Sequence, residues 1–354
     1  MQSIPVLVQA GTGYDLLLCG PCIADRSTEQ RITAAADVRR RAAGIGSGTV
    51  ASTIERIGRD PFINLLGFAH AKTEQPTAGA VVAALREADA REVLLTMLGY
   101  FRRAYRLATP SDVIRDAADG DRRAIREFQR SSYPHVGHWQ ATLRYLLGRA
   151  ADEVRDELVE AMAAWHAQGF ADLEAEIDEA QRADAARVAD LAATRDLDDV
   201  LAQLVPGITF ARELGQSLVV LAPSTILRPG WAMTDFGQVL VIAYPAQPGR
   251  ASTSEPPPRL VYIAKALGDE LRVRALRELR PAPLSGSELA RRLGVPRTSL
   301  QHHLGILVNA GLVRLATDDA RWGHLELRPE ALDELAALAT GWILERGAGP
   351  SEPR

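Results

Sequence analysis

The sequence predicts a mainly α-helical protein that ends in a winged helix-turn-helix domain. Residues 28–203 are dominated by Ala, Leu, Arg and Glu, which favour helices. Two short β-branched runs at 217–222 and 238–243 predict a small β-hairpin or sheet within 217–243. From residue 259 onward, short amphipathic helical segments precede a predicted β-hairpin and a final helix, which is the element order of a winged helix-turn-helix.

Length and composition fit a soluble globular protein. The chain has 354 residues, enough for two or three domains, of which 47% are hydrophobic and 24% charged. The net charge of −4 means that a nucleic-acid partner would need a local basic surface. The first residues lack the basic region of a secretory signal, and no apolar run reaches membrane-spanning length. We therefore expect a cytoplasmic protein with no membrane association.

The N-terminal region begins with a short apolar run, Ile4–Val8, that predicts a strand. Helices should follow to about residue 203, with the clearest stretch at about 150–193, where apolar residues recur at helical spacing. Three prolines predict breaks between these helices: Pro76, Pro110 and Pro134. The glycine-rich segments Gly11–Gly13 and Gly44–Gly48 lack a phosphate-binding lysine, so we interpret both as turns.

A change of composition predicts the domain boundary. Residues 245–258 are rich in Pro, Gly and Ser, which is typical of a stiff linker. We expect a mostly helical N-terminal domain at 1–250, a Pro-rich linker at 251–258, a winged helix-turn-helix domain at 259–346 and a flexible tail at 347–354.

The elements of the predicted C-terminal domain have clear start and stop signals. Ser287 is a natural N-cap, Gly294-Val295-Pro296 forms the turn between two short helices, and Gly311 stops the second helix. The expected helices are 261–267, 271–279, 287–293, 297–309 and 329–344. The expected strands of the wing are 312–316 and 324–328, which are joined by a turn at 317–323.

The predicted helix 297–309 has two contrasting faces. Leu300, Leu304 and Leu307 share one face and should pack on the preceding helix. Thr298 and His302 lie on the opposite face, which is small, polar and free of acidic residues. A helix that enters a DNA major groove needs such a face.

A local basic segment surrounds this helix. Between Leu289 and Thr317 there is no acidic residue, but four arginines occur: Arg291, Arg292, Arg297 and Arg314. We expect DNA contacts from the helix and the wing at Arg297, Thr298, Ser299, Gln301, His302, His303 and Arg321. His303 has an alternative interpretation, because its angle places it near the apolar face, where it would be a packed core residue.

The C-terminal segment resembles ArsR-type winged-helix repressors. The resemblance rests on the runs 264–272 (AKALGDELR), 287–290 (SELA) and 299–304 (SLQHHL), which occur in the order of the family. It implies a homodimer that binds double-stranded palindromic operator DNA and pairs through its first and last helices. The interface residues implied in this way are Val261, Ala264, Leu267, Leu335, Ala339, Trp342 and Ile343.

Metal-sensing members of this family have cysteines in the helix before the recognition helix, or His and acidic ligands on the last helix. Here residues 287–293 contain no Cys and residues 329–344 contain no His. We therefore expect neither a metal ion nor a cofactor.

Cys19-Gly20-Pro21-Cys22 has the spacing of the thioredoxin redox motif. That motif begins a helix after a buried strand, and no βαβ pattern is visible around these residues. Three interpretations stay open: incidental or structural cysteines, a redox switch, and half of a metal site.

Two groups of aromatic and His residues occur in the N-terminal region: Tyr133, His135, His138 and Trp139, and the pair Trp165-His166. We interpret both as partly buried aromatic patches, with a metal or ligand site as the alternative. A pocket lined by such aromatics would suit a small-molecule effector.

The main hypothesis is a dimeric transcription regulator, a repressor without enzymatic activity, whose N-terminal domain binds a small-molecule effector. One alternative is a thiol-disulfide redox protein that acts through Cys19 and Cys22. Another is a winged-helix protein-interaction module that does not bind DNA.

Overall fold

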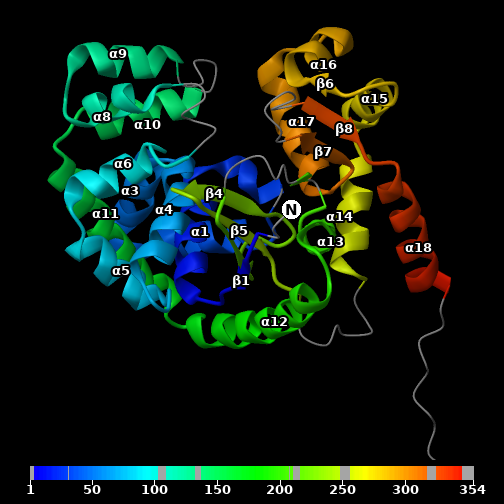
Figure 1. Ribbon diagram of the computed structural model, residues 1–354, viewed down its shortest axis with the longest axis horizontal. Coiled ribbons are helices and arrows are strands. Elements are labelled where there is room, and N and C mark those ends of the chain that lie inside the picture. Colours follow the sequence, from blue (N-terminus) through cyan, green and yellow to red (C-terminus); the bar gives the residue numbers. More distant parts are fainter. Residues whose placement is uncertain are drawn as a thin grey trace, which may run out of the picture. The chain divides into compact units, whose positions relative to one another are not determined.

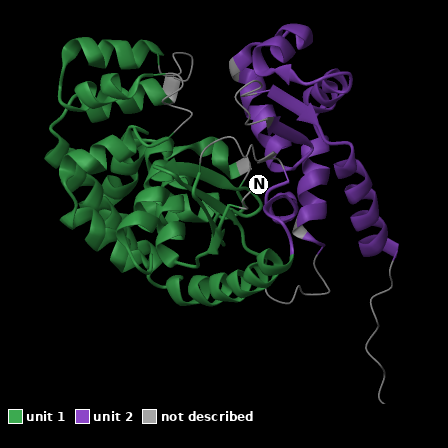
Figure 2. Ribbon diagram, viewed as in Figure 1, with its two compact units in different colours: residues 1–194, 215–247 green, residues 195–214, 248–354 purple. Residues whose placement is uncertain are grey.

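The chain divides into two compact units, coloured separately in Figure 2. Unit 1 comprises Met1–Thr194 and Gly215–Gln247, and unit 2 comprises Arg195–Leu214 and Pro248–Arg354. The structure is a computed structural model that describes residues 4–30, 32–102, 109–131, 137–206, 208–209, 216–247, 256–316 and 324–344. The boundary predicted at 251–258 lies just beyond the third crossing between the units, after Gln247, and no boundary is predicted at the two earlier crossings, after Thr194 and after Leu214.

Unit 1 is mainly helical, as the sequence predicts (Figure 1). Its described helices up to α6 are α1 (Thr12–Ala24), η1 (Arg26–Gln30), α2 (Ala35–Ala43), η2 (Ile45–Gly48), α3 (Thr49–Ile57), α4 (Arg59–Lys72), α5 (Ala78–Glu87) and α6 (Ala90–Met97). The later ones are α8 (Ser111–Ala118), α9 (Arg122–Ser131), α10 (Gly137–Leu147), α11 (Ala151–Trp165), the π-helical turn η3 (His166–Phe170) and α12 (Glu174–Thr194).

The sheet of unit 1 has the spatial order β1-β3-β5-β4. The strands are β1 (Val6–Val8), β3 (Leu218–Ser224), β4 (Ala232–Phe236) and β5 (Val239–Pro245). Both β1 and β5 pair with β3 in parallel, and β4 pairs with β5 in the antiparallel sense. Most residues of β3 and β5 are buried, because α4 packs against β4 and β5 while α12 packs against β1 and β3.

The predicted strands at Ile4–Val8, 217–222 and 238–243 are confirmed as β1, β3 and β5. The latter two are parallel neighbours, and the hairpin of this sheet is formed by β4 and β5. No βαβ pattern is visible in the sequence around Cys19, but in the structure β1 leads into α1 and pairs in parallel with β3. The partner of Val6 is Val219, so the pattern arises from a long-range pairing that a local reading of the sequence cannot show.

α1 is the central helix of unit 1. Every residue from Thr12 to Ile23 is buried, as expected for a helix that carries apolar side chains on all sides. Glycine allows its neighbours to come close: a Cβ at Gly20 would lie 2.3 Å from the ring of Phe62 on α4. A Cβ at Gly13 would likewise lie 2.5 Å from Val81 on α5.

The glycine-rich segment Gly11–Gly13 is the start of α1, with Gly11 as the N-cap, rather than the turn that the sequence predicts. The amide of Gly13 donates to the carbonyl of Pro76 at 2.8 Å, and the amide of Gly11 donates to Oε1 of Gln181 at 3.1 Å. The hydroxyl of Thr12 accepts from the amide of Ala78 at 2.9 Å. A phosphate would need these amide groups as donors, so their partners argue against phosphate binding at this helix N-terminus.

Asp15 on α1 is a fully buried carboxylate that links three elements. Its oxygens accept hydrogen bonds from the hydroxyl of Ser224 at the end of β3, from the amide and hydroxyl of Thr225 at 2.9 and 2.8 Å, and from Nε2 of Gln181 on α12 at 3.1 Å. Burial raises the pKa of Asp15, and these hydrogen bonds oppose the rise.

Cys19 and Cys22 are free thiols on α1, and both side chains are fully buried. Burial raises the pKa of Cys19 well above its ordinary value, so the reactive thiolate is disfavoured. Within the described part of the chain, no group of three or more His, Cys, Asp or Glu residues is placed to hold a metal ion. These observations favour structural cysteines over a redox switch.

Unit 2 contains the helices α13 (Leu197–Leu204), α14 (Pro258–Leu267), α15 (Glu270–Leu279), α16 (Gly286–Leu293), α17 (Arg297–Asn309) and α18 (Glu330–Leu344). Its sheet has the order β2-β7-β8-β6, from β2 (Ile208–Thr209), β7 (Val313–Ala316), β8 (His324–Leu327) and β6 (Leu284–Ser285). β7 and β8 form the antiparallel hairpin that the sequence predicts. β2 adds a strand parallel to β7, which brings residues 208–209 into this unit.

We expect Asp15→Ala to lower the free energy of unfolding by about 2–4 kcal/mol, because it leaves buried donors without an acceptor. Urea denaturation of the intact chain measures this loss. Asp178→Ala is the matched control, since Asp178 forms an ion pair with Arg182 near the surface of α12 and should contribute less than about 1 kcal/mol. Equal losses in the two variants would contradict the anchoring role of Asp15.

Candidate nucleic-acid interface

α16 and α17 form two short helices joined by a tight turn. Ser285, and not the predicted Ser287, caps α16 by accepting a hydrogen bond from the amide of Glu288 at 3.2 Å, in an S-x-x-E capping arrangement. Gly294 ends the helix in the left-handed conformation, with φ of 67°, which glycine adopts without strain. Pro296 then directs the chain into α17, which begins at Arg297.

The inner face of α17 is apolar, as the sequence predicts. Leu300 and Leu307 are fully buried, and Leu304 is 8% exposed. This face packs against α15 and α16. The packing fixes the orientation of α17 and therefore determines which side chains point outward.

The outer face of α17 carries most of the predicted DNA contacts. Arg297, Ser299 and Gln301 are exposed, and His302 is partly exposed. The backbone of Thr298 belongs to the same helix, but its side chain lies outside the described residues, as does Arg321 in the wing. The structure therefore brings Arg297, Ser299, Gln301 and His302 together on one helix.

His303 points toward α15 rather than along the outer face. Its Nδ1 lies 3.3 Å from Oδ1 of Asp269, and its side chain is 21% exposed. Asp269 is the N-cap of α15 and accepts from the amide of Arg272 at 3.0 Å. This position agrees with the packed interpretation of His303, and its DNA contact stays a prediction.

The basic segment around α17 is partly neutralised by one residue that the sequence reasoning missed. Glu288 on α16 pairs with Nε of Arg291 at 2.9 Å and with Nε of Arg292 at 2.9 Å. These guanidinium groups lower the pKa of Glu288 to about 2. Arg314 lies 4.0 Å from Glu326, whereas exposed Arg297 has no acidic partner among the described residues.

Within the C-terminal segment of unit 2, the first and last helices, α14 and α18, leave an apolar surface accessible. α14 and α18 pack against each other, and Arg259 pairs with Glu334 at 2.8 Å across them. Ala331 is the buried residue of α18, while Ile343 is 71% exposed and Leu332 44% exposed. The residues implied as a dimer interface are exposed or partly exposed in the single chain: Val261, Ala264, Leu267, Leu335, Ala339, Trp342 and Ile343.

The aromatic and His residues of unit 1 do not form a described pocket. Trp139 and Trp165 are core side chains with 1% and 0% exposure. His166 lies 2.9 Å from Oε2 of Glu174, whose other oxygen accepts from the hydroxyl of Thr12 at 2.6 Å. His135 and the side chain of His138 lie outside the described residues.

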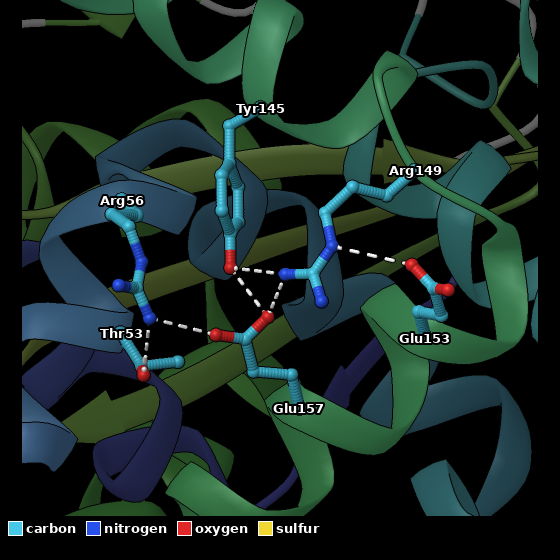
Figure 3. A network of polar contacts seen from close by, with 6 residues as sticks. All are labelled: Thr53, Arg56, Tyr145, Arg149, Glu153 and Glu157. Atoms are coloured by element: carbon cyan, nitrogen blue, oxygen red, sulfur yellow. Dashed lines mark hydrogen bonds and ion pairs between the residues drawn. The ribbon is translucent and has the colours of Figure 1, made fainter.

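A cavity of about 300 Å³ lies elsewhere in unit 1, beside Tyr145 of α10. Figure 3 shows a polar network that includes two of its lining residues, Arg56 and Tyr145. In this network Glu157 accepts from Tyr145 and from Nη2 of Arg56 at 2.8 Å. The guanidinium groups of Arg56 and Arg149 lie 5.6 and 5.4 Å from the ring centroid of Tyr145. Burial and the bond to Glu157 raise the pKa of Tyr145, so its hydroxyl stays protonated.

A family model described as a helix-turn-helix domain matches residues 267–316, from the end of α14 to the end of β7. No curated protein and no solved structure matches the chain. Unit 2 therefore carries a helix-turn-helix domain, a module typical of DNA-binding transcription regulators. Among the described residues, no helix is both long and apolar enough to cross a membrane.

Proposed function

We propose that the protein is a transcriptional repressor that reads operator DNA with α17. The observation that carries the proposal is the exposed outer face of α17, which lies within the matched helix-turn-helix domain and begins at Arg297, a residue with no acidic partner among the described residues. The N-terminal residues of a recognition helix contact base edges in the major groove, and Arg297 and Ser299 occupy those positions. The role as a repressor rests on the resemblance to ArsR-type proteins.

We expect the intact chain to bind DNA from upstream of its own coding sequence, and Arg297→Ala and His302→Ala each to weaken that binding. A lost contact to a base typically reduces affinity by about 1–3 kcal/mol, or roughly 5- to 150-fold. Fluorescence anisotropy at fixed salt measures the dissociation constant. Arg86→Ala removes the same charge as Arg297→Ala from an exposed site on α5 and is the control.

Unchanged affinity in both α17 variants would remove the assignment of α17 as the recognition helix. A wild-type chain that binds no DNA would instead favour a winged-helix protein-interaction module.

The proposed form on DNA is a homodimer that binds a palindromic operator. The exposed apolar residues of α18 and α14 support it, because a large accessible apolar stripe is unusual on a monomeric surface. A two-fold contact through this stripe would cover Ile343 and its neighbours. It would also repeat α17 at the spacing of one DNA turn, about 34 Å.

We expect Leu335→Glu combined with Ile343→Glu to produce a monomer with weakened operator binding, because each introduced carboxylate would be buried without a partner in the dimer. Sedimentation velocity and anisotropy measure the two effects. Ala337→Glu with Thr340→Glu adds the same charge at exposed positions on the opposite side of α18 and should leave the dimer intact. A double variant that still sediments as a dimer and binds DNA normally would place the interface elsewhere.

We also propose that the cavity beside Tyr145 binds the small-molecule effector. Its volume of about 300 Å³ lies at the lower end of the range for ligand pockets. Its lining includes Arg26, Arg56 and Arg59 together with Asp25 and Glu55. Arg56 is paired with Glu157, and Arg59 is paired with Asp25 and Asp60. Arg26 has no ion pair with a described residue, so a ligand that carries a carboxylate or phosphate group would complement this lining.

We expect a small carboxylate or phosphate compound to raise the melting temperature of the intact chain and to change its affinity for DNA. Ala141→Phe would fill the cavity, since Ala141 lines it, and should abolish both effects. Ala36→Phe adds the same side chain at an exposed site on α2 and is the control. A ligand that acts equally on the wild type and on Ala141→Phe would place the effector site elsewhere.

A further inference from the structure

α9 of unit 1 has a strongly basic outer face. Arg122, Arg123, Arg126 and Arg130 are all exposed, whereas Ala124 and Phe128 are buried. At 3.6 residues per turn, the four arginines fall within an arc of about 100° opposite the two buried residues. Figure 1 shows α9 at the outer edge of unit 1, beyond α8 and α10.

These arginines differ from most exposed arginines of unit 1 because they have no acidic partner among the described residues. Arg40, Arg91 and Arg182, by comparison, pair with Asp37, Asp119 and Asp178. The nearest acidic groups along the chain do not neutralise the face. Asp121 accepts from the backbone amides of Arg123 and Ala124, and Glu127 forms no ion pair with a described residue.

The arrangement is unfavourable for the isolated helix. Arg122, Arg126 and Arg130 follow one another at i,i+4 spacing, at which like charges repel and destabilise a helix. The one contact between neighbours is a hydrogen bond from Nε of Arg130 to the carbonyl of Arg126 at 3.2 Å, which neutralises no charge. A polyanion placed along the face would remove the repulsion.

We propose that α9 is a second DNA-contacting surface, where these four arginines bind backbone phosphates. The i,i+4 arginines are spaced by about 6 Å and extend over about 12 Å of helix, a length over which duplex DNA presents several phosphates. Guanidinium groups match phosphate oxygens in geometry and are never deprotonated. The surface supplies affinity without reading sequence, because phosphate contacts carry no base information.

This inference rests on the proposed function and adds to it. DNA is favoured over an acidic protein partner because the same chain carries a helix-turn-helix domain. A phosphate-binding surface on unit 1 would raise the affinity for DNA that we propose for this domain. The overall charge of −4 does not support general attraction to polyanions, so attraction must come from local faces such as this one.

The test is the salt dependence of DNA binding by the intact chain. In the α9 variant, Arg122, Arg123, Arg126 and Arg130 are each replaced by Gln, which favours helices and preserves the length of the side chain. Each lost phosphate contact should reduce the slope of log K against log salt by about 0.9. Loss of four contacts should therefore make the fall in affinity between about 50 and 200 mM salt about 100-fold smaller.

The control variant carries Arg40→Gln, Arg86→Gln, Arg182→Gln and Arg195→Gln, which remove the same charge from exposed sites outside α9. It should keep the wild-type slope, and circular dichroism should show that both variants remain folded. The α9 variant should also keep its preference for the upstream fragment over unrelated DNA, while Arg297→Ala should lose that preference and keep most of the slope.

If the wild-type chain binds DNA but the α9 variant has the same salt slope, this inference is overturned and the proposed function is not. An acidic protein would then be the alternative partner of α9. Equal loss of slope in the control variant would overturn it as well, because the effect would then follow total charge. A wild-type chain with no affinity for any DNA would overturn both this inference and the proposed function.

Discussion

Unit 1 depends on the burial of α1. This helix contacts α2, α3, α4, α5 and α12 as well as β3. The positions of these surrounding elements therefore depend on how α1 is packed. Two features make the burial feasible: glycines let Phe62 and Val81 approach the backbone closely, and the Asp15 carboxylate is satisfied by donors from β3 and α12. The same burial keeps Cys19 and Cys22 away from solvent, which favours a packing role over redox chemistry for this motif.

Local signals predicted unit 2 more closely than unit 1. The positive φ of Gly294 depends on residues within one turn of the helix, and the predicted boundaries of α16 and α17 agree with the structure to within one residue, although the cap is Ser285 rather than the predicted Ser287. Unit 1 depends on pairings such as Val6 with Val219, which involve the two ends of its sequence. For the same reason β2 was not predicted. Its partner β7 lies about 100 residues later in the chain, and local periodicity does not reveal such a pairing.

The candidate interface shows the same division between local and non-local information. Helical periodicity placed Leu300 and Leu307 inside and Arg297 and Gln301 outside, because a single amphipathic helix decides both. The sequence pattern overestimated the positive charge near α17. Glu288 lies just before the segment without acidic residues, yet it pairs with Arg291 and Arg292. The contact of His303 with Asp269 depends on how α15 packs against α17, which no pattern within α17 contains.

The pairing state of each arginine therefore matters more than the number of arginines. Arg291 and Arg292 would have to exchange Glu288 for a phosphate to bind DNA, so part of the gain would be offset by the lost ion pairs. The arginines of α9 and Arg297 would lose no such partner among the described residues, and an approaching phosphate would relieve the repulsion along α9. For a chain with a net charge of −4, the proposed affinity for DNA would thus be set by a few uncompensated guanidinium groups on helices rather than by composition.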